Sequence, residues 1–270
     1  MMRVLSGALL AAVAVVVVWF APAPVFLAAA GILLLLAFAE YVRLAAACGL
    51  PVPWLPAAAA AIAASAGVAS TGSLGGQGAG PAVALDAVLM SGVVLLGATM
   101  LLSWRGGRNA LGLASASVFP SLYLGLPFGA LASIRELRGR EALLLLLLTV
   151  TVSDTAQYYT GRRFGRRPLA PAISPKKTVE GAIGGLVSGG LVLALAGAWW
   201  LPAVPIGLRA ALGATLVASG IAGDLFESAL KRSAGVKDSS SLIPGHGGIL
   251  DRIDALLFAA PVYYVVLSYV

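Results

Sequence analysis

The segment from Ser228 to Asp254 holds the side chains best suited to chemistry. It reads SALKRSAGVKDSSSLIPGHGGILDRID and gathers cations, carboxylates, glycines and the only histidine of a chain that is 60% hydrophobic and 11% charged. Asp251 and Asp254 stand three residues apart near its end, so on a helix they share one face. Capping of a helix N-terminus explains one such aspartate better than two. We therefore expect the pair to bind a ligand.

Further acidic residues precede this segment. Asp224, Glu227 and Lys231 are spaced by three and four residues, which places them on one side of a helix. Asp154 lies in an apolar stretch eight residues before Arg162, which is roughly 12 Å along a helix. A carboxylate near a membrane centre costs about 2.5–3.5 kcal/mol. Asp154 should therefore face a metal, water or a cation, and an arginine of a neighbouring helix is the structural alternative.

Four aspartates together offer hard oxygen ligands: Asp154, Asp224, Asp251 and Asp254. The sequence has one cysteine and one histidine, so it contains no cluster with the usual zinc spacing. Mg²⁺ is the ion that these ligands favour, because it binds a few carboxylates and completes its shell with water and substrate phosphates. The acids therefore predict a magnesium site for a phosphorylated substrate.

Basic side chains flank these acids and could offset the charge of a phosphate: Lys176, Lys177, Lys231, Arg232, Lys237 and Arg252. Any one of them could instead extend to lipid head groups, so the group is more informative than its members. The backbone N–H groups of Gly247 and Gly248 could approach a phosphate closely. We expect His246 between the glycines to bind substrate rather than to act as a base.

Membrane-spanning helices must position these residues. The mean hydropathy of +0.96 is too high for a water-soluble protein. We predict an all-α fold, a polytopic transmembrane helical bundle of about nine spans that forms a single integral membrane domain over residues 1–270. The first, around residues 4–20, is expected to be a retained helix rather than a removable leader. The others are expected around residues 25–39, 54–69, 83–102, 111–134, 142–159, 181–201, 207–230 and 253–270.

The basic residues also predict the orientation of the bundle. With a cytoplasmic N-terminus, fourteen of the eighteen Lys and Arg residues fall in cytoplasmic loops. This bias alone accounts for the net charge of +7. Both polar segments, 153–180 and 224–254, then face the cytoplasm and could form one site. Residues 1–140 are expected to be helices without a recognisable motif, and residues 141–270 the catalytic helices and loops.

The C-terminal segment resembles the signature of the phosphatidate cytidylyltransferase family, also called CDP-diacylglycerol synthases. The resemblance rests on S-x-L-K-R, then K-D, then I-P-G-H-G-G-I-L-D-R-I-D, with matching spacing over 27 residues. Upstream, Ser153-Asp154-Thr155 and the stretch from Ser174 to Gly181 resemble the family's earlier polar segment. Gln157 and Val179 depart from it, because members often have a small residue and a tryptophan there. The resemblance covers roughly the C-terminal half.

The resemblance implies an enzyme that joins CTP to phosphatidic acid, releasing CDP-diacylglycerol and pyrophosphate at the cytoplasmic face of a prokaryotic inner membrane. It implies that Asp224 and Asp251 hold Mg²⁺, with Asp254 and Asp154 nearby and a second cation left open. Catalytic roles are expected for Asp224, Asp251, Asp254, Lys231, Arg232 and Lys237. Substrate binding is expected for Ser153, Asp154, Lys176, Lys177, Thr178, Glu180, His246, Gly247, Gly248 and Arg252.

Other classes of function stay open at this point. Another CTP-using lipid enzyme, such as one resembling a polyprenol kinase, would need similar residues. An ion-coupled transporter would place acids at the midplane of paired repeats, whereas these acids lie near predicted cytoplasmic ends. An inactive scaffold is disfavoured because all four aspartates are present. The expected partners are CTP, phosphatidic acid and the lipid bilayer, without nucleic acid, and a homodimer is left open.

Overall fold

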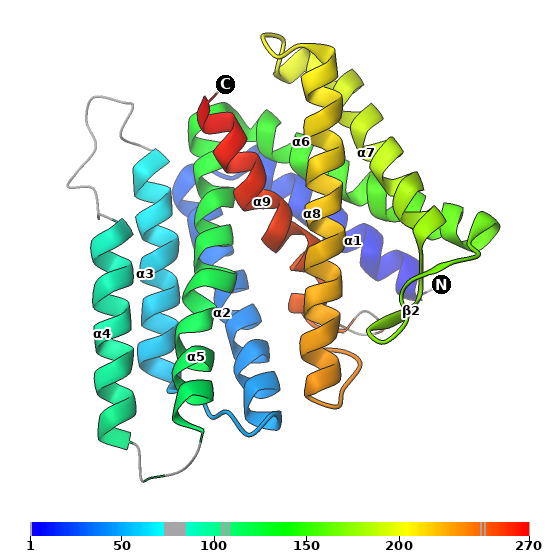
Figure 1. The fold of residues 1–270 in the computed structure, drawn as a ribbon. Coiled ribbons are helices and arrows are strands. Elements are labelled where there is room, and N and C mark those ends of the chain that lie inside the picture. Colours follow the sequence, from blue (N-terminus) through cyan, green and yellow to red (C-terminus); the bar gives the residue numbers. More distant parts are fainter. Residues whose placement is uncertain are drawn as a thin grey trace.

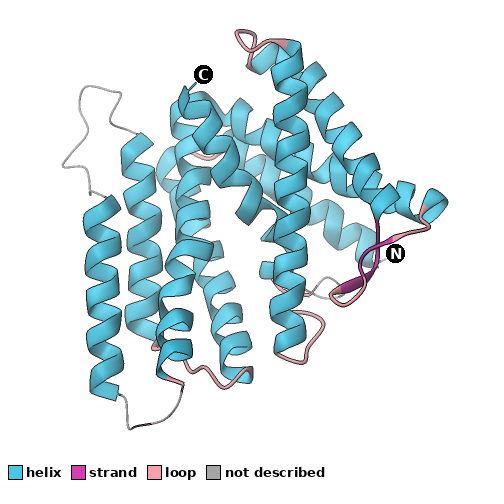
Figure 2. Cartoon of the chain, in the orientation of Figure 1, coloured by secondary structure: helices cyan, strands magenta, loops and turns pink. Residues whose placement is uncertain are grey.

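The computed structural model describes residues 2–72, 85–103, 106, 109–243, 245 and 247–269. Helices dominate this part of the chain (Figures 1 and 2). The elements are α1 (Met2–Phe20), α2 (Ala23–Ala47), α3 (Trp54–Gly72), α4 (Leu85–Ser103), α5 (Ala110–Pro120), the π-helix η2 (Ser121–Gly125), α6 (Leu126–Phe164), β1 (Pro168–Ala170), β2 (Ser174–Thr178), α7 (Val179–Trp200), α8 (Ile206–Ser233) and α9 (Leu250–Tyr269).

Helices α5 and α6 form one continuous run that contains a π-helical turn and a bend. The π-helical turn η2 directly follows Pro120, which cannot donate a backbone hydrogen bond. The bend lies at Gly139, whose φ of 84° and ψ of 171° are not helical. The two helices predicted at 111–134 and 142–159 are therefore present as the arms on either side of Gly139. Glycine adopts this backbone conformation without the strain that a Cβ would cause.

Two arginines beside this bend bind the ends of distant helices. Arg138 Nη2 donates to the carbonyl of Leu267 at 2.6 Å, and Arg140 Nη1 donates to the carbonyl of Trp19 at 3.0 Å. Carbonyls in the last turn of a helix have no partner within the helix, so a guanidinium satisfies them well. The bend at Gly139 thus fixes the C-terminal ends of α1 and α9.

Four described helices are long and apolar enough to cross a membrane: α2, the run from α5 to α6, α7 and α8. Shorter apolar helices lie at Ala11–Phe20, Trp54–Ser70 and Leu85–Leu101. The helices occupy the segments that the sequence predicts, but the expected count of about nine spans is not confirmed. The chain is thus a bundle of apolar helices that suits a bilayer.

The helical fold is confirmed, and one short two-stranded hairpin is added to it. Strands β1 and β2 pair antiparallel, with Pro168 opposite Thr178 and Ala170 opposite Ser174 (Figure 2). The hairpin leads directly into α7, where the hydroxyl of Thr178 accepts the N–H of Gly181 at 3.1 Å and caps the helix. Strands of three and five residues are too short to produce a clear alternating pattern, so the sequence reads here as a loop.

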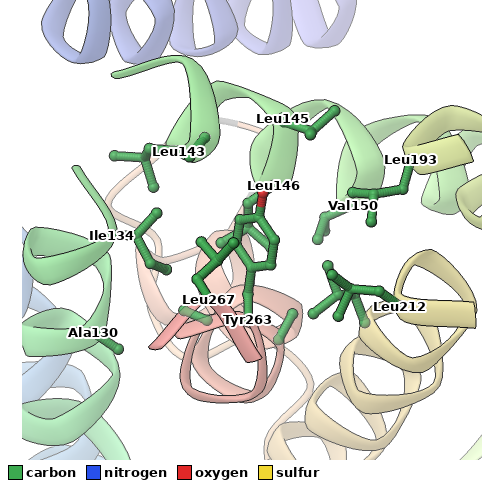
Figure 3. Close-up of a cluster of buried hydrophobic side chains, with 14 of the residues drawn as sticks. Ala130, Ile134, Leu143, Leu145, Leu146, Val150, Leu193, Leu212, Tyr263 and Leu267 are labelled. Carbon is green, nitrogen blue, oxygen red and sulfur yellow. The ribbon is translucent and has the colours of Figure 1, made fainter. Parts of the chain in front are cut away.

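One of two hydrophobic clusters packs the helices of the C-terminal half together. Tyr263 of α9 is fully buried between side chains of α6 and α8, including Leu146 and Leu212 (Figure 3). Its hydroxyl has no hydrogen-bond partner among the described residues. Helix α9 therefore depends on this ring for its position against α6 and α8.

This packing predicts opposite outcomes for two substitutions of Tyr263. Tyr263→Phe should keep or raise the stability of the protein, because it removes a buried hydroxyl without a partner. Tyr263→Ala should lower the free energy of unfolding by about 3–5 kcal/mol, because it leaves a cavity. Thermal unfolding of the purified protein in detergent measures both, and equal destabilisation by the two variants would contradict the packing described.

Candidate active site

One cavity of about 600 Å³ collects acidic and basic side chains from segments far apart in the chain. It lies between α6, the β-hairpin, α7, α8, α9 and the loop that joins α8 to α9. Its charged lining consists of Asp154, Arg162, Lys176, Lys177, Asp224, Lys231, Arg232, Lys237, Asp238, Asp251, Arg252 and Asp254. The four aspartates predicted to bind metal thus line the same cavity, as do the six predicted cations.

The regular spacing of α8 supplies one wall of the cavity. Asp224, Ser228 and Lys231 follow each other at four and three residues, so they lie on the same side of the helix and all line the cavity. Glu227 shares this side but is fully buried behind the wall. Ser228 Oγ donates to Asp224 Oδ1 at 3.4 Å. This part of α8 therefore presents a carboxylate, Asp224, and an ammonium group, Lys231, to the cavity.

Ion pairs connect α8 to its neighbours. Lys177 of β2 pairs with Asp224. Lys231 is 8% exposed and pairs with the fully buried Glu227 and with Asp251 Oδ1, the latter at 2.5 Å. A buried ammonium between two carboxylates is stable only while those partners remain. Lys231 thus holds α8 against the start of α9.

Asp251 is the most heavily hydrogen-bonded of the four aspartates. Besides the bond from Lys231, its Oδ2 accepts the N–H of Ser239 at 2.9 Å, the hydroxyl of Ser239 at 2.7 Å and the N–H of Gly248 at 2.7 Å. Burial raises the pKa of Asp251, but the hydrogen bonds from Lys231, Gly248 and Ser239 outweigh burial and hold that pKa below its usual range. Asp251 is therefore an oriented carboxylate anion.

The other three aspartates repel one another across the cavity. Asp154 interacts unfavourably with Asp224, and Asp254 does so with both. Lys177 and Arg252 offset part of this charge at Asp154. A bound cation would relieve the remainder, and carboxylate oxygens are the ligands that Mg²⁺ prefers. The donor set therefore fits a divalent ion by its chemistry, although within the described ranges no three Asp, Glu, His or Cys side chains are arranged as a preformed metal site.

Several predicted substrate-binding residues do not line the cavity. Ser153 is buried, and its hydroxyl donates to the carbonyl of Val150 at 2.8 Å in its own helix. Glu180 accepts the N–H groups of Arg166 and Arg167 at 3.0 and 3.2 Å and so closes the base of the hairpin. These two side chains have partners that keep them out of the cavity, so their expected contact with substrate finds no support in the geometry.

The glycine-rich loop is arranged differently from the expectation. Gly247 has a φ of 79° and accepts the N–H of Ile243 at 2.8 Å, which closes a tight turn. The N–H of Gly248 donates to Asp251, and Gly248 itself does not line the cavity. His246 lies outside the described residues. The described glycines therefore shape the loop and orient a carboxylate.

Two further residues of the cavity carry polar groups that the sequence reading left without a role. Gln157 Nε2 donates to Asp154 Oδ1 at 3.0 Å, so it orients this carboxylate. Tyr158 lies one residue further, and its hydroxyl accepts from Arg162 Nη1 at 3.3 Å. Both follow Asp154 by three or four residues, and in a helix this spacing predicts that they lie on the same side as Asp154.

The chain belongs to the cytidylyltransferase family, whose model matches residues 1–270. Among its relatives are proteins named phosphatidate cytidylyltransferase. The one from Aquifex aeolicus (strain VF5) is 40% identical over 153 residues, 56% of this chain and 56% of that protein. The one from Bacillus subtilis (strain 168) is 39% identical over 191 residues, 69% of this chain and 67% of that protein. The chain spans about half the length of several curated relatives that it matches.

The ion pairs of Lys231 predict a strong and specific stability defect. Lys231→Ala should lower the free energy of unfolding by about 3–5 kcal/mol, because Glu227 and Asp251 would lose their buried cation. Removing one of the two acids as well, in Lys231→Met with Glu227→Gln, should recover part of that loss. Thermal unfolding measures both variants, and a single variant as stable as the unmodified protein would contradict the arrangement.

Proposed function

We propose that this protein transfers the cytidylyl group of CTP to phosphatidic acid, giving CDP-diacylglycerol and pyrophosphate. The observation that carries the proposal is that the four aspartates and six cations predicted from the sequence converge from distant segments in one cavity of an apolar helical fold. Membership of the cytidylyltransferase family and the names of the relatives support the same reaction.

The reaction is a substitution at phosphorus. A phosphate oxygen of phosphatidic acid attacks the α-phosphorus of CTP, the new P–O bond forms, and the bond to the β-phosphate oxygen breaks so that pyrophosphate leaves. The nucleophile is already an anion, so no strong general base is needed. The main obstacle is repulsion between two anionic reactants, which the cationic lining reduces while the cavity holds both in place.

The aspartates are proposed to hold Mg²⁺ rather than to move protons. Asp224 and Asp251 would bind the ion, with Asp254 and Asp154 close by. When bound, the ion would supply positive charge against the triphosphate. Lys177 pairs with Asp224, and Lys231 pairs with Asp251, at the wall of the cavity.

The substrates place the site at a membrane surface. CTP is water-soluble, and phosphatidic acid is held in the bilayer, so the cavity must face both phases. The excess of basic residues in the loops around the cavity favours the cytoplasmic side of a bacterial inner membrane.

A direct assay tests the proposed reaction. The purified protein is incubated with CTP labelled in its cytosine ring, phosphatidic acid and Mg²⁺, and a labelled lipid and pyrophosphate are sought. With a polyprenol in place of phosphatidic acid, a kinase-like enzyme would transfer the γ-phosphate and leave the label in free CDP, whereas the proposed enzyme would leave CTP unchanged. No labelled lipid with phosphatidic acid would refute the proposal.

Asp251→Asn should reduce product formation by about 100-fold or more, because bound metal contributes several kcal/mol to the stabilisation of the transition state. Asp86→Asn, at the exposed start of α4 outside the cavity, is the matched control and should leave turnover unchanged. Insertion in the membrane and thermal unfolding establish that the variant is folded. If Asp251→Asn turns over as fast as the unmodified protein, Asp251 does not bind a metal that the reaction needs.

Lys237→Ala should act on substrate binding alone. Lys237 is exposed at the rim of the cavity, so its loss should raise the apparent KM for one substrate about fivefold and leave kcat nearly unchanged. Lys237→Arg keeps the charge and should stay close to the unmodified enzyme. Initial rates over a range of CTP and lipid concentrations give KM and kcat for each variant. An unchanged KM for both substrates in Lys237→Ala would count against phosphate contact at Lys237.

A further inference from the structure

Glu40 is a buried carboxylate from the half of the chain that carries no recognisable motif. It lies in α2, is 1% exposed, and receives four hydrogen bonds from the segment that joins α8 to α9. Its Oε1 accepts the hydroxyl of Ser240 at 2.7 Å and the N–H of Ile249 at 3.0 Å. Its Oε2 accepts the hydroxyl of Ser239 at 2.9 Å and the N–H of Leu250 at 2.8 Å.

Two of these donors belong to the start of α9. Leu250 is the first residue of that helix, and the first N–H groups of a helix have no partner within it. A carboxylate placed there satisfies them and interacts favourably with the helix dipole. Glu40 therefore caps α9 from another helix.

The same carboxylate is connected to Asp251 through a single hydroxyl. Ser239 Oγ lies 2.9 Å from Glu40 Oε2 and 2.7 Å from Asp251 Oδ2, so its one proton is shared between the two acids. Gly248 lies against this group, and a Cβ there would overlap Ser239 Oγ and both carboxylate oxygens of Glu40. The loop is thus packed around Glu40 and Asp251 as one unit.

We infer that Glu40 is a positioning residue for the reaction proposed above. It fixes Ser239 and Ser240 and the start of α9 at Ile249 and Leu250, so that Asp251 and Asp254 face the cavity. It does not itself line the cavity, and its contacts are with Ser239, Ser240 and the backbone. The expected effect of Glu40 on kcat rests on the proposed function. Its expected effect on the order of the segment before α9 does not depend on that function.

The substitution Glu40→Gln isolates this role, because it preserves shape and removes one acceptor. Each oxygen of Glu40 faces a backbone N–H, so the amide nitrogen of glutamine opposes a donor in either orientation. Hydrogen–deuterium exchange should become faster in the peptide covering residues 239–252 and stay unchanged in α7. Glu136→Gln, an exposed position of α6, is the matched control.

Kinetics give the second measurement. Glu40→Gln should lower kcat by about 10- to 100-fold, as loss of a supporting partner of a site carboxylate commonly does. The KM for CTP should change less than about threefold, because no contact with CTP is removed. Unchanged exchange in 239–252, or unchanged kcat, would overturn the inference. If the unmodified protein makes no cytidine-containing lipid, the proposed function fails, and the exchange measurement still decides whether Glu40 holds the loop.

A double-mutant cycle tests the connection through Ser239. Ser239→Ala removes the shared hydroxyl, so adding Glu40→Gln to it should reduce kcat much less than Glu40→Gln does alone. Effects that multiply would contradict action through Ser239. If Glu40→Gln raises exchange throughout the chain, the whole protein is destabilised, and Ser240→Ala is measured instead. This variant removes one donor to Glu40 and keeps the carboxylate. Faster exchange confined to the peptide covering residues 239–252, together with a lower kcat, then supports the inference. Exchange rates and a kcat equal to those of the unmodified protein overturn it.

Discussion

Pairing of buried charge is the constraint on which the arrangement of the site depends. Carboxylates and ammonium groups removed from water are costly unless each meets an opposite charge or a set of hydrogen-bond donors. In this protein Lys231 of α8 pairs in this way with Asp251 of α9, and the partly exposed Lys177 of β2 pairs with Asp224 of α8. The ion pairs therefore stabilise the site and join the elements that carry it.

Close approach of α7 and α8 brings the hairpin within reach of α8. Gly189 and Gly213 face each other, and a Cβ on Gly213 would overlap the carbonyl of Gly189. Small residues at such a crossing allow helix backbones to pack closely, as is common in membrane proteins. Lys177 stands just before α7, so this crossing helps to place its ammonium group against Asp224.

Much of the site could be predicted from residue type and helical spacing. The intervals among Asp224, Ser228 and Lys231 place them on one wall, and a helix beginning near Asp251 turns its carboxylate toward the same space. An acid within an apolar segment, such as Asp154, indicates a charged or polar neighbour because its placement there is costly. These inferences depend on local periodicity and on solvation, which both act within one segment.

Contacts between distant segments could not be read in this way. The binding of Glu180 to the backbone N–H groups of Arg166 and Arg167 depends on which partner is nearest after folding. The hairpin was missed because its strands are short. His246 lies outside the described residues, so the expectation of substrate contact there stays a prediction.

The position of Glu40 has a different explanation, because the need for it arises in the loop and not in α2. The segment from Ser239 to Leu250 contains the hydroxyls of Ser239 and Ser240 and the free N–H groups of a helix start, and Asp251 takes up only some of these donors. Such an excess of donors requires an acceptor from elsewhere in the fold. A lone glutamate in an apolar helix is costly without donors. The excess of donors and the buried carboxylate of Glu40 are each unfavourable alone, and the hydrogen bonds between them satisfy both. Donors without a partner beside a sequence motif therefore indicate that an acceptor from another part of the chain binds there.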